Sequence, residues 1–114
     1  MKLNNITLEG RLTLDPVNKS KEDSKISAVR IAYEYGYDSE KKEAKVGFID
    51  VLLTGYNADY SNANLKKGFR VIVGGKLAVS KYTSKDGKSV EKEVIFADFL
   101  ECLEKKVETE NGNK

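Results

Sequence analysis

The sequence predicts an all-β fold: a five-stranded Greek-key barrel with a short helix between its third and fourth strands. Three features of the 114-residue chain carry this prediction. Five stretches are apolar on one or both faces when they are read with the period of two that strands have. A short polar stretch after the third of them has the end signals of a helix. The glycine pair Gly74-Gly75 interrupts the fourth, where a long barrel strand can bend.

The first predicted strand is LNNITLEGRLTLD, residues 3–15. Its mostly apolar side consists of Asn4, Ile6, Leu8, Gly10, Leu12 and Leu14. Pro16 ends this strand, because proline cannot donate to a strand ladder. The polar stretch VNKSKEDS that follows is expected to be a loop.

The second predicted strand runs from about Lys25 to Tyr35, with Val29, Ile31 and Tyr33 on one face. The charged stretch GYDSEKKEAK then forms a hairpin loop that leads into the third strand.

The third predicted strand, VGFIDVLLTGY, covers residues 46–56 and is apolar on both faces. Ile49, Val51 and Leu53 share the face that belongs in the core. The other face mixes aromatic rings with a carboxylate and a hydroxyl, and consists of Phe48, Asp50, Leu52, Thr54 and Tyr56. Such a mixture is a poor interior and an unusual inert surface, so we treat this face as a candidate binding surface.

A helix of about two turns is expected next. Asn57 has the side chain of an N-cap, and Asp59 falls in the first turn, where a negative charge suits the helix dipole. Lys66 and Lys67 fall in the last turn, and Gly68 supplies a left-handed stop.

The fourth predicted strand is FRVIVGGKLAVSKY, residues 69–82. One face consists of Val71, Val73, Leu77 and Val79, and the other of Arg70, Ile72, Lys76, Ser80 and Tyr82, provided that Gly74-Gly75 does not shift the alternation. A turn around Asp86-Gly87 leads to a fifth strand from about Val90 to Leu103.

This order of elements is that of an OB-fold, a barrel that uses its second and third strands and its hairpin loops to bind oligonucleotides or oligosaccharides. An SH3-like barrel is the nearest alternative, and it lacks the helix. Residues 1–103 are expected to form one domain. Residues 104–114, EKKVETENGNK, have almost no apolar content and are expected to be a disordered tail.

Composition argues against an enzyme. The chain has no histidine and one cysteine, Cys102, which is expected to be a small buried hydrophobe. The usual zinc sites and histidine-based catalysis are therefore excluded, and neither a phosphate-binding loop nor a carboxylate cluster appears. We expect no cofactor, metal or small-molecule substrate.

The absence of a long apolar run or leader predicts no membrane partner and a cytoplasmic protein. The net charge of +2 means that any nucleic-acid surface must be local.

Several segments, in this order and at this spacing, resemble the bacterial and phage single-stranded-DNA-binding proteins. They are NNITLEGRLTLDP, FIDVLLTGYNAD, LKKGFRVIVGGKL, YTSKDGK and EVIFADFLECL, within residues 3–103. No single segment is diagnostic, but the ordered set is specific. The resemblance implies an OB-fold that binds single-stranded DNA without reading its sequence. It also implies a role in protecting and organising such DNA during replication, recombination or repair, with no catalytic activity.

The resemblance also implies which side chains touch DNA. Phe48 and Tyr82 match base-stacking tryptophans of the family, and Tyr37 or Tyr35 matches a third. Face and loop position alone single out the same residues, although Phe48 packed under a loop and Tyr82 in a cross-strand contact are the structural alternatives. The candidate phosphate contacts are Lys67 and Lys81, which match basic family positions, and Lys76, Lys85, Lys88 and Arg30, which are chosen from face and loop position.

One family motif is altered. Thr54-Gly55-Tyr56 stands where the family commonly has Phe-Gly-Lys, so a ring and an ammonium are both replaced. Tyr56 lies two residues further on the same face of the strand, so its ring can replace the missing one. Packing of Tyr56 onto the following helix is the alternative.

The resemblance further implies a homotetramer. Host-cell members carry an acidic tip that recruits recombination and replication proteins, whereas this chain ends in Asn-Gly-Asn-Lys. It therefore resembles the short forms of phages and mobile elements, or a truncated longer chain. Two other functions stay open at this point: a protein-interaction adaptor with an OB-fold, and an RNA- or primosome-directed OB protein.

Overall fold

The computed structural model describes residues 3–104, which form six strands and one helix. The elements are β1 (Ile6–Leu12), β2 (Val17–Asn18), β3 (Ile26–Asp38), β4 (Glu43–Thr54), α1 (Gly55–Asn64), β5 (Arg70–Thr83) and β6 (Ser89–Cys102). The strands follow the order β1-β5-β6-β4-β3, and pairing of β1 with β3 closes the five long strands into a barrel. This is the predicted five-stranded barrel, with its helix between the third and fourth long strands.

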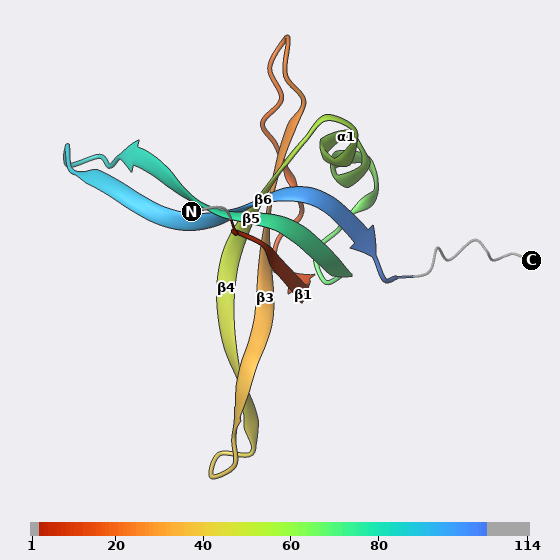
Figure 1. Ribbon diagram of the computed structural model, residues 1–114, viewed down its shortest axis with the longest axis vertical. Helices are drawn as coiled ribbons and strands as arrows, with labels where there is room; N and C mark the ends of the chain where they lie inside the picture. Colours follow the sequence, from red (N-terminus) through yellow and green to blue (C-terminus); the bar gives the residue numbers. More distant parts are fainter. Residues whose placement is uncertain (1–2, 105–114) are drawn as a thin grey trace, which may run out of the picture.

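Two long hairpins extend from the barrel in different directions (Figure 1). One is the hairpin of β3 and β4, and the other is the hairpin of β5 and β6. α1 lies at the end of the barrel away from the turn that joins β3 to β4. The core lies in the barrel, and the hairpins add exposed surface beyond it.

The predicted alternation of the barrel strands is confirmed. Gly10 and Leu12 are buried, while Glu9 and Arg11, which alternate with them, are exposed. The core is made of apolar side chains from every long strand and from α1: Leu12, Val29, Ile31, Val51, Leu53, Ala58, Leu65, Val71, Val73 and Ile95. Cys102 is partly buried and packs against this core.

The glycine pair bends the fourth long strand without shifting its alternation. The pairing between β5 and β6 steps from Gly74 opposite Phe99 to Gly75 opposite Ala97, so the extra residue is Asp98 on β6. A Cβ at Gly75 would meet the Phe96 carbonyl and come within 2.8 Å of Ala97 Cα. Glycine is needed here because the two backbones approach closely. Leu77 and Val79, beyond the bend, continue the face of Val71 and Val73 but are exposed.

Several predicted strand boundaries were wrong. The first strand covers Ile6–Leu12 and not residues 3–15, so it ends before Pro16 is reached. The stretch VNKSKEDS is not all loop, since Val17 and Asn18 pair with β3 as the short strand β2. The second strand does not end at Tyr35 but continues to Asp38, and the third begins at Glu43. GYDSEKKEAK is therefore mostly strand, because backbone pairing across the hairpin outweighs its charged composition.

The predicted helix ends were also wrong. α1 begins at Gly55, and Thr54 is its N-cap, because Gly55 adopts a φ of +63° and lets the chain turn directly from strand into helix. Asn57 and Asp59 therefore lie inside the helix, where Asp59 pairs with Lys25 at 2.6 Å. Leu65 is the C-cap, and Lys66, Lys67 and Gly68 follow the helix.

Within residues 3–104 no helix is long and apolar enough to span a membrane, and no group of three or more His, Cys, Asp or Glu side chains could hold a metal ion. Residues 105–114, which contain most of the predicted tail, lie outside the described part of the chain. Glu104 is described, and its carboxylate accepts a hydrogen bond of 2.9 Å from the backbone N–H of Arg70.

Candidate nucleic-acid interface

Four strands, in the order β3, β4, β6 and β5, share one solvent-facing side, which we call the outer face. Directly paired residues point to the same side of a sheet, so the register defines its members. Phe48 is opposite Ala32, and Asp50 is opposite Arg30. Leu52 is beside Phe96, which is in turn opposite Lys76. The outer face therefore carries Arg30, Tyr37, Phe48, Asp50, Leu52, Lys76, Tyr82, Lys92 and Phe96.

Phe48 lies near the middle of this face, with 54% of its surface exposed. Its ring is not packed under a loop, which was the structural alternative. The guanidinium carbon of Arg30 is 5.5 Å from the ring centroid, a cation–π arrangement. Phe48 and Arg30 thus present an aromatic plane and a positive charge side by side.

Tyr37 shares the face of Phe48 because of a β-bulge. Strict alternation along β3 would place Tyr37 with the buried Ile31, on the other side of the strand. The pairing steps from Glu34 opposite Val46 to Gly36 opposite Lys45, which leaves Tyr35 as the extra residue. Tyr37 is therefore opposite Ala44, on the outer face, whereas Tyr35 is an exposed residue of the bulge.

Tyr82 is on the outer face of the other hairpin, opposite Val90, and 51% of its surface is exposed. The turn beyond it is well defined: Gly87 has a φ of +84°, and the Ser84 hydroxyl donates to the Asp86 carboxylate. This hydrogen bond, together with one from the Lys88 backbone N–H, lowers the pKa of Asp86. These hydrogen bonds stabilise the turn fully when the pH is above the ordinary pKa of aspartate. The stabilisation is lost as the pH falls through the lowered pKa of Asp86.

The six predicted basic residues are not gathered in one place. Arg30 and Lys76 are on the outer face, and Lys85 and Lys88 are exposed in the β5–β6 turn. Two others are elsewhere. Lys81 alternates with Tyr82 and so points to the opposite side of the hairpin, where its Nζ is 3.8 Å from Glu91 Oε2. Lys67 is in the loop after α1, and its backbone N–H donates to Asp15 at 2.8 Å.

Tyr56 does not continue the face of Phe48, because β4 ends at Thr54. It lies in the first turn of α1 and is 79% exposed. Its ring centroid is 6.5 Å from that of Tyr60. Burial raises the pKa of the Tyr60 phenol, and Cys102 and Tyr56 add smaller contributions. The strand position assumed for Tyr56 was therefore wrong, and its ring belongs to the helix surface.

Phe96 was missed in the sequence. It lines a groove of about 420 Å³ on the outer face, together with Ile26, Leu52, Thr54, Lys76, Ala97 and Asp98. About half of the Phe96 surface is exposed. Its position in EVIFADF, two residues after Val94 and four after Lys92, could have placed it on a common strand face, but nothing in the sequence shows that β6 lies beside β4.

A cluster of three charges was also missed. The Asp50 carboxylate accepts a hydrogen bond of 3.2 Å from Arg30 Nη1 and pairs with the Lys92 ammonium. These groups border a hollow of about 280 Å³ that Phe48 and Glu93 also line. Asp50 thus forms an ion pair with both Arg30 and Lys92, the two cations that border the hollow beside the exposed Phe48 ring.

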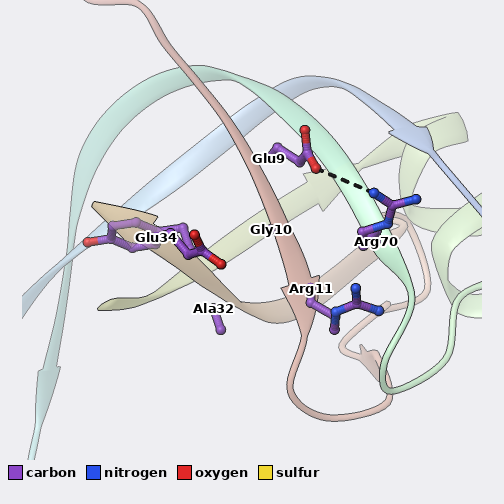
Figure 2. A pocket seen from close by; sticks show the side chains of 7 residues that line it. Glu9, Gly10, Arg11, Ala32, Glu34 and Arg70 are labelled. Atoms are coloured by element: carbon purple, nitrogen blue, oxygen red, sulfur yellow. Dashed lines mark ion pairs between the residues drawn. The ribbon is translucent and has the colours of Figure 1, made fainter. Parts of the chain in front are cut away.

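A second hollow, of about 310 Å³, lies at the junction of β1, β3 and β5 (Figure 2). Arg70 Nη1 is 3.8 Å from Glu9 Oε2 there, and Glu34 and Arg11 lie at its edges. Charges of both signs line this hollow, and its aromatic residue, Tyr33, is partly buried, whereas Phe48 beside the other hollow is half exposed. It suits a polyanion less well than the outer face does.

A barrel of this topology with a half-exposed aromatic and basic face belongs to the class of OB-fold proteins. A profile of the Single-strand binding protein family matches residues 3–103, and the chain belongs to that family. Two relatives are named single-stranded DNA-binding protein. The one from Fusobacterium nucleatum is 32% identical over 91% of this chain and 69% of its own length. The one from Wolinella succinogenes is 28% identical over 96% and 69%.

Two solved structures confirm the fold. The Plasmodium falciparum SSB in complex with ssDNA has a TM-score of 0.77 at 24% identity, over 91% of this chain and 97% of the other. The small single-stranded DNA-binding protein from Streptomyces coelicolor has a TM-score of 0.69 at 23% identity, over 90% and 95%. The family and the names of its members describe binding, in agreement with a protein that is not an enzyme.

Proposed function

We propose that the protein binds single-stranded DNA without reading its sequence, by stacking bases on the aromatic rings of the outer face. The observation that carries this proposal is the half-exposed ring of Phe48 with the Arg30 guanidinium beside it. Every base has a π-face, so a ring can stack any of them, and a neighbouring cation can meet the phosphate. Membership of the Single-strand binding protein family supports the same ligand.

Three aromatic rings of the outer face lie in a row along β4, as contacts to an extended DNA strand would require. Tyr37 is level with Ala44 of β4, and Phe96 is level with Leu52. Together with Phe48 they mark three positions on β4 that are four residues apart, which corresponds to about 13 Å between neighbours. We propose that single-stranded DNA follows this row along β4, with Tyr82 as a further stacking site on the other hairpin. Lys76 lines the groove beside Phe96 and can meet a phosphate there.

A titration with a thirty-nucleotide oligo-dT tests the proposal. Tyrosine emission should be quenched as bases stack, and the logarithm of the affinity should fall with the logarithm of the salt concentration by about 0.7 per phosphate neutralised. No binding at low salt would contradict the proposed function. Binding without tyrosine quenching would favour contact through another surface.

The same assay separates the two other functions. An OB-fold adaptor that binds a protein should show no response to oligo-dT at any salt concentration. An RNA-directed OB protein should prefer an RNA oligomer of equal length in competition with DNA, since the 2′-hydroxyl is the group that distinguishes the two. The family favours DNA over both alternatives.

We further propose that the protein acts as a homotetramer in the cytoplasm, where it protects single-stranded DNA and meets replication, recombination or repair proteins. The DNA-binding domain is taken to be residues 1–103, followed by a tail over 104–114. Light scattering tests the assembly, because one chain has a mass of 12.7 kDa and a tetramer has four times that mass. A mass of one chain in dilute solution would contradict the tetramer.

A further inference from the structure

The charge cluster on the outer face points to a role for Asp50. Its side chain is 24% exposed and lies between Arg30 on β3 and Lys92 on β6. Arg30 in turn lies over the Phe48 ring. Glu93 borders the same hollow, and Tyr33 is the remaining titratable group there. The two cations nearest to the stacking ring are therefore already paired with a carboxylate in the free protein.

A phosphate and this carboxylate compete for the same donors. A base stacked on Phe48 would bring its backbone phosphate near Arg30 and Lys92, since both border the hollow that Phe48 lines. Asp50 repels that phosphate, and its pairing with each cation must be exchanged for pairing with the phosphate. A cation that stays paired with Asp50 neutralises less phosphate charge, so fewer of the counterions condensed on the DNA are released. Both the affinity and its salt dependence should therefore be lower than two free cations would give.

We propose that Asp50 is an internal competitor of the DNA phosphate: it holds Arg30 and Lys92 in the free protein and thereby limits the affinity and the salt dependence of DNA binding. This inference rests on the proposed function. It assigns an affinity-setting role to a residue that touches no base. It also gives a reason for a carboxylate beside the exposed Phe48 ring, where its charge alone would only weaken binding.

The test is Asp50→Asn, which keeps the shape of the side chain and removes its charge. We expect oligo-dT to bind about tenfold more tightly at low salt, since two exposed ion pairs no longer oppose it. The slope of log affinity against log salt should steepen by about 0.7 to 1.4, as one or two more phosphates are neutralised. Asp50→Glu retains the carboxylate and should keep the wild-type slope.

Asp59→Asn is the matched control. It breaks the exposed ion pair between Asp59 and Lys25, which joins α1 to the start of β3 and lies outside the hollow at Phe48. It makes the same change in net charge, so an effect of overall charge would appear equally in both variants. We expect its affinity and salt slope to stay closer to wild type than those of Asp50→Asn.

The outcomes are distinct. If wild type binds oligo-dT and Asp50→Asn behaves as Asp59→Asn does, Asp50 is no competitor and the inference fails alone. Weaker binding by Asp50→Asn would also overturn it, because Asp50 would then serve to hold Arg30 in its binding position. If wild type does not bind oligo-dT, the proposed function itself fails. Thermal unfolding of each variant confirms that the comparison is between folded proteins.

Discussion

Replacing Phe48 with alanine is expected to weaken the binding of oligo-dT by about 1–3 kcal/mol, the usual loss when one base-stacking ring is removed. Phe48 is half exposed, so its removal opens no cavity in the core and should leave thermal stability close to that of wild type. Arg30 would also lose the ring over which it lies. Fluorescence anisotropy of a labelled oligo-dT measures the affinity, and circular dichroism measures the stability.

Val46→Ala is the matched control for Phe48→Ala. Val46 is two residues away on the same strand and the same face, and it is 44% exposed, but it has no ring. Its truncation should change the affinity much less than truncation of Phe48. If Phe48→Ala instead lowers stability while the folded fraction keeps its affinity, the rings of the outer face are structural.

Replacing Leu53 with alanine should have the opposite signature, with a loss of about 2–5 kcal/mol in the free energy of unfolding. Leu53 is fully buried in the core cluster on the inner side of β4, so its truncation leaves a cavity that close-packed neighbours fill only in part. The affinity of the folded fraction for oligo-dT should stay near that of wild type. Denaturant unfolding followed by circular dichroism gives the loss of stability.

The control for this change is Leu14→Ala, because Leu14 is 56% exposed and lies outside the core cluster. It removes the same atoms with little loss of buried area and should change the free energy of unfolding by much less. An equal loss in both variants would mean that the core is not where the structure places it.

Residue patterns predicted the parts of this fold that depend on one strand at a time. The core side of β4 follows from the alternation of Ile49, Val51 and Leu53, and the bend at Gly74-Gly75 follows from the glycine pair. The start of α1 did not follow, because a positive φ at Gly55 places the N-cap at Thr54, three residues before the expected Asn57.

Features that depend on the partner strand could not be predicted. The bulge at Tyr35 appears only when β3 is aligned with β4, and it alone puts Tyr37 on the side of Phe48. Phe96 and Lys92 reach the outer face only because β6 pairs in parallel with β4. Residues of β6 that are far from Phe48 in the chain therefore share its face of the sheet, which the order of the motifs does not reveal.

The central claim is that DNA lies on the outer face, and photocrosslinking tests it most directly. Irradiation of the complex with oligo-dT, followed by mass spectrometry of the digested protein, identifies the side chains against which bases lie. We expect adducts on Phe48 and on the rings that share its face, Tyr37, Tyr82 and Phe96. Adducts confined to Tyr56 and Tyr60 on α1 would contradict the claim and place the DNA on the helix surface.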